Sequence, residues 1–508
     1  MKKDSFFGIV TIEKTTRYNP RKGIHAMKAD VIIDQETQKV KLIFDWAAGK
    51  IGEHLTADEA ENVVKLIEAA SQNANREAFK AWLMQHECHD DVTVVDGKTY
   101  RFKMVSEKKF LTKFGVIIVP RRIFQQDNGG KTYVPLDVAW EMSGEYATRD
   151  VRECVLYMSA SMSPNETEEC LQKIAAFHPS RTAIQNIIDE TGQLLEQHED
   201  VLLDEVRLHE ELPIKETKVF AVSLDGVNVR LNTPGKKKGR PTERPKDEAS
   251  MSRETPSCFK NAMVGVCGLY GEVPQNTDSN ASTNTSTPKR LYGNCLARMP
   301  EDHAMTFKRK IETEVNSMLV RLPEGTVKIV LMDGGRNLWG YVNATKLYDD
   351  FEKLLDFHHA MEHISQGAEG IFGKGTEASK AWYRKMEAML LEYEDGVHRV
   401  IRSLEYYLAR YEYKESSREL MTSCLTFLQN NAHIMEYKRF RDNGWPIGSG
   451  PVEGACKNIV KQRLCRSGMR WSIPGGQTIL TLRSIVKSNR WNEFWNACKK
   501  LPGLSKPA

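Results

Sequence analysis

The alternation of apolar and polar residues changes character several times along the N-terminal part of the chain. Segments 29–34 and 39–46 are rich in β-branched and aromatic residues and flank a polar turn, which predicts a β-hairpin. A capping box, Thr56 to Glu59, starts a long helical segment with one break. Residues 92–134 then alternate between apolar and polar side chains around Gly-containing turns, which predicts a small antiparallel sheet.

The segment that follows has a helical pattern. Ser163 starts one helix, the sequence HPS at 178–180 breaks it, and a second helix extends from residue 181 to about residue 198. Two helices around a short turn are compatible with a DNA-reading helix-turn-helix. The second helix is not strongly basic, so a plain helical hairpin is the favoured interpretation.

Two acids stand in or directly after core strands. The segment KVFAVSLDGVNVRL at 218–231 has the composition of a central strand and contains Asp225. Burying an unpaired carboxylate is costly, so such an acid is normally paired, hydrogen-bonded or bound to a metal. The alternative for Asp225 is an Asp-Gly turn at a strand end. A further strand is expected at 262–270, and the near-continuous apolar strand at 326–332 ends directly before Asp333, where α/β sheets commonly carry their sites.

The stretch from residue 444 to 471 combines a glycine-rich loop with a helical pattern. Pro451 suits the first helical position, and the apolar residues after it recur at helical spacing. Glu453, Lys457 and Lys461 follow one another at intervals of four, so an acid stands at the start of a cationic helix face. An acid in the first turn also stabilises a helix start, so Glu453 has both a structural and a functional interpretation.

Composition indicates a globular protein without membrane segments. The chain has 40% hydrophobic and 28% charged residues, and it has no run of about 18 apolar residues that could cross a membrane. Its ten cysteines include no CxxC pair, which fits reduced thiols in a cytoplasm. The net charge is only +4, but residues 437–508 hold 14 Lys or Arg against 3 Asp or Glu. This asymmetry favours a polyanionic partner such as nucleic acid over a merely solvated basic face.

Two histidine clusters are weak candidates for metal binding. The sequence HECHD at 86–90 has three potential ligands close together but no partner pair at zinc-finger spacing. His359 and His363 are one helical turn apart, but no third ligand is evident nearby. A role in shaping an acidic site is the favoured interpretation of the second cluster.

The three acids Asp225, Asp333 and Glu453 together suit two-metal phosphoryl chemistry. Mg²⁺ prefers oxygen ligands and keeps positions open for substrate phosphate. A pair of ions about 4 Å apart can activate the attacking oxygen and stabilise the leaving one. Flanking Lys and Arg side chains would bind the phosphate backbone, which makes binding sensitive to salt.

Four segments carry a resemblance to a known family: SLDGVNV, LMDGGRNLW, LLDFHHAMEH and NGWPIGSGPVEGACKNIVKQRLCRSGMRW. They resemble bacterial insertion-sequence transposases of the DDE type, in particular the ISKra group, over about residues 100–500. The resemblance implies a ribonuclease-H-like catalytic core within a mixed α/β, multidomain fold. It also implies that Asp225, Asp333 and Glu453 bind Mg²⁺ (or Mn²⁺).

The resemblance extends to residues around these acids. Asp356 and His359 match the accessory D-x-x-H that often follows the second acid. Trp471 is expected to stack on a base or simply to pack. The residues expected to hold DNA phosphates are Lys457, Lys461, Arg463, Arg466 and Arg470.

The implied reaction is cleavage of a phosphodiester at the element end by water, followed by attack of the freed 3′-hydroxyl on target DNA. The implied partners are transposon-end DNA, target DNA and further copies of the chain, in the bacterial cytoplasm and associated with the nucleoid. Two alternatives remain open. One is a nuclease of the same core without strand transfer, and the other is a non-catalytic DNA-binding protein descended from a transposase.

The expected organisation has four regions. A strand-plus-helix region at 1–90 precedes a small β region at 91–147 and a helical region at 148–212 that is a candidate for DNA binding. The catalytic domain is expected at 213–508, with a helical insertion at about 365–440.

Overall fold

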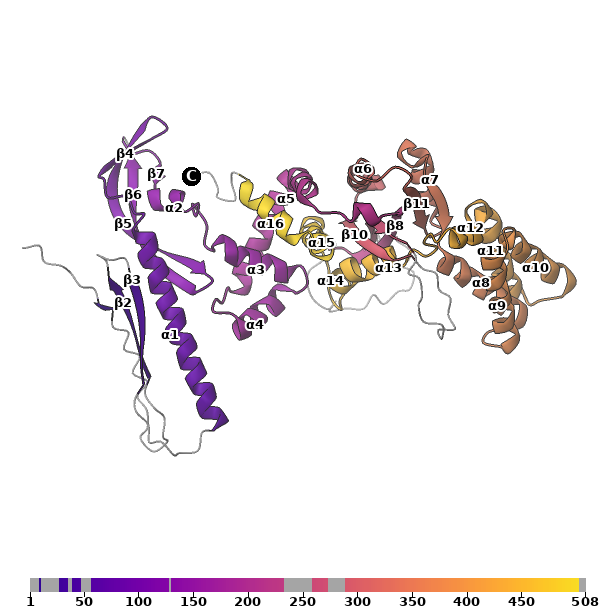
Figure 1. Ribbon diagram of the computed structural model, residues 1–508, viewed down its shortest axis with the longest axis horizontal. Helices are drawn as coiled ribbons and strands as arrows, with labels where there is room; N and C mark the ends of the chain where they lie inside the picture. Colours follow the sequence, from indigo (N-terminus) through magenta and orange to yellow (C-terminus); the bar gives the residue numbers. More distant parts are fainter. Residues whose placement is uncertain are drawn as a thin grey trace, which may run out of the picture. The chain divides into compact units, whose positions relative to one another are not determined.

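The structure is a computed structural model that divides into two compact units (Figure 1). One unit comprises residues 1–190 and 498–508, and the other comprises residues 191–497. The residues that the structure describes are 9–10, 27–34, 39–46, 56–127, 129–232, 258–272 and 288–501.

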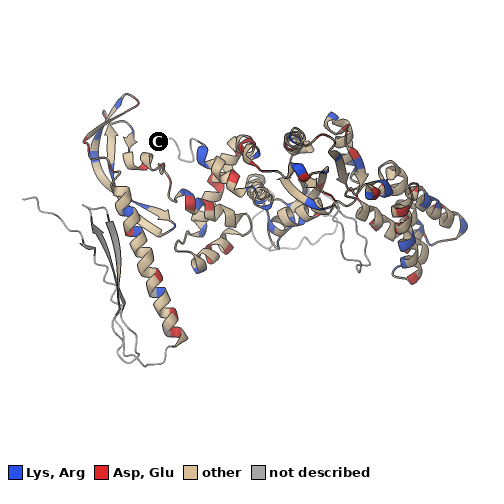
Figure 2. Ribbon diagram, viewed as in Figure 1, with Lys and Arg blue, Asp and Glu red and all other residues tan. Residues whose placement is uncertain are grey.

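The first unit begins with the expected hairpin, which is confirmed. Strands β2 (Met27–Asp34) and β3 (Lys39–Trp46) pair antiparallel, and the short β1 (Ile9–Val10) pairs with β2. Helix α1 (Ala57–Met84) follows without the expected break, because the segment contains neither Gly nor Pro. The Glu59 side chain of the expected capping box lies outside the described residues. Figure 2 shows acidic and basic positions distributed along α1.

A second antiparallel sheet in this unit confirms the small sheet expected at residues 92–134. Side chains on one face of β5 and β6, including Phe110 and Ile117, are buried together with Leu83 of α1. Asp96 and Gly97 form the first turn, both with positive φ. The strands, in spatial and sequence order, are β4 (Val92–Val95), β5 (Lys98–Thr112), β6 (Gly115–Gln126) and β7 (Thr132–Tyr133).

Helices follow this sheet, as expected. Ser163 and Glu166 form a complete capping box, in which each side chain accepts a hydrogen bond from the other residue's backbone N–H. The last helix continues beyond the expected end near residue 198, because apolar residues such as Leu202 and Val206 extend its buried stripe. The helices are α2 (Pro135–Ala139), α3 (Arg149–Ser159), α4 (Pro164–Ile174) and α5 (Arg181–His209).

The second unit is built on a five-stranded mixed sheet, so the mixed α/β class is confirmed. The spatial order is β10-β9-β8-β11-β12. The first three strands pair antiparallel, and β11 and β12 run parallel to β8. The strands are β8 (Val219–Arg230), β9 (Phe259–Tyr270), β10 (Arg290–Arg298), β11 (Val327–Met332) and β12 (Glu352–Leu355).

Strand β8 corrects one local expectation. The sequence pattern left open an Asp-Gly turn at Asp225, but β8 continues through Gly226 and pairs with β9 along its whole length. Asp225 itself pairs with Val264. The acid therefore lies inside a central strand, where burial and pairing fix the backbone around it.

Buried ion pairs join α5 to α6 (Met305–Leu319) and to the segment after α15 (Ile473–Lys487). Arg490 contacts Glu210 at 2.7 Å and Glu314 at 2.5 Å, and Arg207 contacts Glu314 at 2.6 Å. Burial opposes ionisation of Glu314, but the charges of Arg490 and Arg207 outweigh it and hold the pKa of Glu314 below its usual value. We refer to Arg207, Glu210, Glu314 and Arg490 as the arginine-glutamate network.

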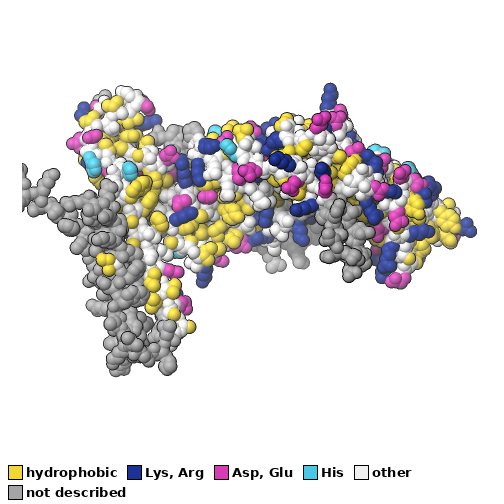
Figure 3. Space-filling model, viewed as in Figure 1, with side chains coloured by type: hydrophobic (Ala, Val, Ile, Leu, Met, Phe, Trp, Pro, Cys, Tyr) yellow, Lys and Arg dark blue, Asp and Glu magenta, His cyan; other side chains and the backbone are white. Residues whose placement is uncertain are grey.

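A helical module follows β12 and begins at Phe357. Trp382, Met386 and Leu404 are among its buried side chains. Helices α8 and α11 pack against each other, and charged side chains of both signs are interspersed on the face shown in Figure 3. The helices are α8 (Phe357–Phe372), α9 (Glu377–Glu392), α10 (Gly396–Arg410), α11 (Glu415–Asn431) and α12 (Tyr437–Asp442).

The helix expected after the glycine-rich loop is present. It ends at Leu464 and contains a π-helical segment, η6 (Cys456–Lys461). The remaining helices of this part are α7 (Arg336–Ala344), α13 (Gly450–Ala455), α14 (Gln462–Leu464) and α16 (Trp491–Lys500).

Candidate active site

Strand register brings Asp225, Asp333 and Asp356 into one row across three neighbouring strands of the central sheet. We refer to these three residues as the acid row. Val327 pairs with Val219 and Val330 pairs with Val222, a separation of 108 residues that also separates Asp333 from Asp225. In the same way, β11 pairs with β12 up to Leu355, directly before Asp356. Because neighbouring strands lie about 4.8 Å apart, this register places Asp333 between the backbones of the other two acids.

Asp225 is half-buried and is held by weak, neutral donors. Its Oδ1 accepts a hydrogen bond from the backbone N–H of Gly226 at 2.6 Å. Its Oδ2 accepts one from the thiol of Cys456, with 3.1 Å between sulfur and oxygen. The structure shows no ion pair of Asp225 with a cation among the described residues, so nothing there neutralises its charge.

Asp333 is half-buried at the start of a tight turn. Its Oδ1 accepts a hydrogen bond from the Gly335 N–H at 3.0 Å, and its backbone carbonyl accepts one from the Trp339 indole at 2.6 Å. A Cβ at Gly334 would lie 2.7 Å from the Phe427 ring, so a larger residue there would have to displace this ring. These contacts fix the backbone next to Asp333 and do not involve its Oδ2 atom.

Asp356 is fully buried and is used differently from the other two acids. One carboxylate oxygen caps α8 by accepting the His359 N–H at 2.6 Å, and the other accepts the N–H of Ser449. The N–H of Phe357 also donates to the carbonyl of Ile447 at 3.0 Å. Asp356 therefore ties the start of α8 to the loop that leads into α13.

Glu453 lies exposed in the first turn of α13, near Asp225. The Ser449 hydroxyl donates to its carboxylate at 3.3 Å. Helix α13 contacts β8 and β9, and η6 contacts β8. Burial, then the charge and hydrogen bond of Asp225, and also the charge of Glu453, raise the pKa of the Cys456 thiol. The charges of both acids thus act on the Cys456 thiol.

The basic residues after Glu453 fall into two groups. Lys457, Lys461, Arg466 and Arg470 are exposed, as a phosphate-binding role requires. Arg463 differs from these four, because it is only 2% exposed and its guanidinium lies 5.1 Å from the centre of the Trp471 ring.

Trp471 anchors the end of this segment to β8. Its N–H donates to the carbonyl of Arg230 at 3.1 Å, and its carbonyl accepts the N–H of Asn232 at 2.9 Å. Its indole N–H donates to the carbonyl of Leu464 at 2.9 Å. These contacts give the tryptophan a structural role, and stacking of its ring on a base stays a prediction.

Two supporting residues were not among the predicted site residues. Cys456 stands in an apolar pattern at helical spacing, yet its thiol donates a hydrogen bond to Asp225. Arg483 of α15 donates to the carbonyl of Asn458 in η6 at 2.5 Å and to the Gln462 side chain at 3.3 Å. An arginine inside the otherwise apolar sequence ILTLRSIV was the available signal for Arg483, because a buried cation needs acceptors.

The histidine clusters have structural partners. Glu87 in the HECHD sequence is buried and accepts hydrogen bonds from the N–H groups of Cys88 and Arg122. The His363 ring stacks on Phe427 with 3.7 Å between centroids, and burial followed by the charge of His359 lowers the pKa of His363. Among the described residues, no group of three or more His, Cys, Asp or Glu side chains is arranged to hold a metal ion.

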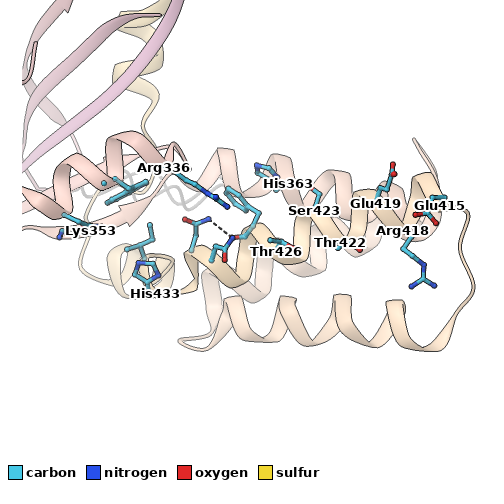
Figure 4. A pocket seen from close by; sticks show the side chains of 18 residues that line it. Arg336, Lys353, His363, Glu415, Arg418, Glu419, Thr422, Ser423, Thr426 and His433 are labelled. Carbon is cyan, nitrogen blue, oxygen red and sulfur yellow. Dashed lines mark hydrogen bonds between the residues drawn. The ribbon is translucent and has the colours of Figure 1, made fainter. Parts of the chain in front are cut away.

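A groove of about 1300 Å³ starts next to the acid row (Figure 4). Gly334, directly after Asp333, is part of its lining. Its walls come from α7 and from α11 of the helical module. The groove thus connects the end of β11 with the surface of the insertion.

Comparisons with known proteins give distant structural likenesses. The chain is similar to a solved structure titled Drosophila P element transposase strand transfer complex, with a TM-score of 0.24 and 11% sequence identity. The match covers 68% of this chain and 80% of that chain. No family model and no curated protein matches the sequence. In the described part of the chain, no helix is both long and apolar enough to cross a membrane.

Proposed function

We propose that this protein is a DDE-type transposase of the ISKra-like kind, with a ribonuclease-H-like core. The observation that carries the proposal is the register of Asp333 with Asp225 at adjacent strands, with Glu453 on a helix that contacts β8 and β9. The strand arrangement, three antiparallel strands followed by two parallel to the first, supports the proposed core.

The donor set suits a hard divalent cation. Asp225, Asp333 and Glu453 offer carboxylate oxygens, which Mg²⁺ and Mn²⁺ prefer. Mg²⁺ is usually bound by one or two carboxylates together with substrate phosphates, so an all-protein cage is not required. When bound, the cation would supply charge stabilisation at the phosphate and activation of the attacking oxygen.

The chain's own residues orient these acids. The Gly226 N–H and the Cys456 thiol hold the Asp225 carboxylate, and the Ser449 hydroxyl holds that of Glu453. The exposed Lys457 and Lys461 follow Glu453 at intervals of four and are proposed to bind DNA phosphates. The proposed products are a free 3′-hydroxyl at the element end and then a strand joined to target DNA, with no covalent protein intermediate.

The proposal is tested with duplex DNA from the regions that flank the reading frame, incubated with protein and Mg²⁺ or Mn²⁺. We expect cleaved strands and strands joined to target DNA. Loss of a residue that only hydrogen-bonds a metal ligand already lowers metal affinity or activity by about 10–100-fold. Because Asp225 and Glu453 are proposed to be ligands themselves, Asp225→Asn and Glu453→Gln should each lower cleavage by more than about 100-fold. Glu394→Gln changes an exposed acid outside the site and is the matched control.

Each alternative predicts a different outcome of the same assay. Cleavage without joined products would indicate a nuclease. DNA binding without metal-dependent cleavage would indicate a non-catalytic DNA-binding protein. Cleavage that persists unchanged in Asp225→Asn would contradict the assignment of the acids. Assembly of several copies on DNA stays a prediction, which light scattering of the DNA complex checks.

A further inference from the structure

The groove beside Asp333 has an aromatic surface near its start. Phe427 and His363 both line the groove, and their rings stack nearly parallel, with an interplanar angle of 16°. Phe427 also lies against the backbone at Gly334, which keeps the ring next to the acid row. Flat ring surfaces of this kind bind nucleic-acid bases by stacking, whatever the base.

Charge along the groove is unequal. Arg336, Lys353 and His433 lie at one end, and Arg418 lies at the other end together with Glu415 and Glu419 (Figure 4). The acids offset the cation at that second end. A phosphate group would therefore bind best at the end that carries Arg336 and Lys353.

The two arginines of the groove are available to a ligand. The side chains of Arg336 and Arg418 are exposed, and neither has a hydrogen-bond or ion-pair partner within the part of the chain that the structure describes. Lys353 differs, because its amine donates to the side chain of Asn343 at 2.9 Å. Arg336 begins α7, directly after the turn that holds Asp333, so its guanidinium can reach an anion near the acid row.

Between the two ends, α11 presents neutral polar side chains. Thr422, Ser423, Thr426 and Asn430 all line the groove from this helix, and all are exposed. Hydroxyl and amide groups of this kind donate and accept hydrogen bonds at the edges of unpaired bases. The groove therefore offers stacking, hydrogen bonding and phosphate binding side by side.

We propose that this groove binds an unpaired DNA strand segment that continues from the phosphate at the acid row. The inference rests on the proposed function and adds a second DNA site to it. An unpaired segment fits better than duplex DNA, because the faces of paired bases are stacked inside a duplex and cannot cover Phe427 or His363. With about 1300 Å³, the groove is larger than the roughly 300–1000 Å³ of usual small-molecule pockets.

The test is binding of a labelled oligothymidylate of about ten nucleotides, measured by fluorescence anisotropy in EDTA. EDTA removes any contribution from cleavage. We expect the full chain to bind this strand more tightly than a duplex of the same length. Phe427→Leu, which keeps an apolar side chain but removes the ring, should weaken binding about tenfold, and Arg336→Ala should weaken it several-fold.

Two further variants make the test specific. Arg384→Ala removes an exposed arginine of the same helical module outside the groove and should leave the affinity unchanged. Glu419→Gln removes a negative charge from the groove and should raise the affinity, an effect that a merely structural role of the groove would not produce. Photo-crosslinks from halogenated thymidylate should map to α7 and α11.

Equal affinities of wild type, Phe427→Leu and Arg336→Ala, or crosslinks only outside α7 and α11, would overturn the inference. This result is separable from the proposed reaction. A chain that cleaves and joins DNA but fails the oligonucleotide test would keep its proposed function and lose the groove site. A chain that passes the oligonucleotide test but cleaves nothing would keep the groove site and lose the proposed reaction.

Discussion

The second unit contains two sets of carboxylates that are held in opposite ways. The side chains of Glu210 and Glu314 in the arginine-glutamate network are 7% and 5% exposed, and each contacts the buried Arg490. Asp225 and Asp333 are half-buried and accept hydrogen bonds from backbone N–H groups and, at Asp225, from a thiol. Carboxylates therefore pair with arginines in the first set, whereas in the second set they have no ion-pair partner among the residues that the structure describes.

The difference separates a structural from a functional use of acids. A carboxylate neutralised by arginines has no remaining attraction for a further cation, and removing one partner leaves a buried charge behind. A carboxylate held by neutral donors keeps its negative charge, so a cation can still bind it. Substitutions in the first set should affect folding, and substitutions in the second set should affect the reaction.

The largest expected effect is on stability, at Glu314. Glu314→Gln leaves Arg207 and Arg490 with incomplete partners inside the protein, so it should lower the free energy of unfolding by about 3–5 kcal/mol. Asp225→Asn should change it by less than about 1 kcal/mol. Denaturant unfolding followed by circular dichroism measures both.

The control is Glu377→Gln, which breaks an exposed pair with Lys380 and should cost less than about 1 kcal/mol.

The pH dependence of the free energy of unfolding gives a second test of Glu314. Because the arginines hold the pKa of Glu314 below its usual value, its contribution is complete above the usual carboxyl pKa. The contribution is lost as pH falls through the lowered pKa, so acid should destabilise wild type more than Glu314→Gln. Equal acid sensitivity would contradict this assignment.

The next largest effect is expected on cleavage, at Asp356. This residue is buried like the arginine-glutamate network but belongs to the acid row. Asp356→Asn replaces one accepting oxygen by an amide, so either the His359 N–H or the Ser449 N–H loses its acceptor. Since Ser449 orients Glu453, we expect cleavage to fall about 10–100-fold.

The readout must distinguish positioning from misfolding. Asp356→Asn should keep its affinity for end DNA in EDTA and need more Mg²⁺ for half-maximal cleavage. Asp356→Ala should bind end DNA more weakly than Asp356→Asn and should need still more Mg²⁺. An unchanged Mg²⁺ requirement would show that Asp356 supports the fold only.

A smaller effect is expected at Cys456. Its thiol occupies one oxygen of Asp225, so Cys456→Ala should free that oxygen for the cation. A net hydrogen bond is worth about 1 kcal/mol, which corresponds to about a fivefold lower Mg²⁺ concentration for half-maximal cleavage. Titration of cleavage against Mg²⁺ measures this change, and a higher requirement would contradict it.

The sequence predicted the strands around Asp225 and Asp333 because apolar and β-branched residues gather there. It could not predict that both acids stand at one register position, since register depends on pairing between strands distant in the sequence. It also missed β12, whose four residues are too short for a periodic signal. The role of Asp356 in holding Ser449 depends on a contact between residues far apart in the chain, which no local pattern encodes.

The smallest expected effect is on DNA affinity, at Lys457. The sequence assigns Lys457 and Arg463 the same phosphate-binding role, but only Lys457 is exposed. Lys457 is exposed on η6, so Lys457→Ala should weaken DNA binding a few-fold and reduce the slope of log affinity against log salt by about 0.9. Arg463 is buried over Trp471, so Arg463→Ala should leave that slope unchanged and lower the midpoint of thermal unfolding instead. Anisotropy at several salt concentrations, together with thermal unfolding, separates the two. A reduced salt slope in Arg463→Ala would mean that its guanidinium leaves Trp471 to contact phosphate when DNA binds.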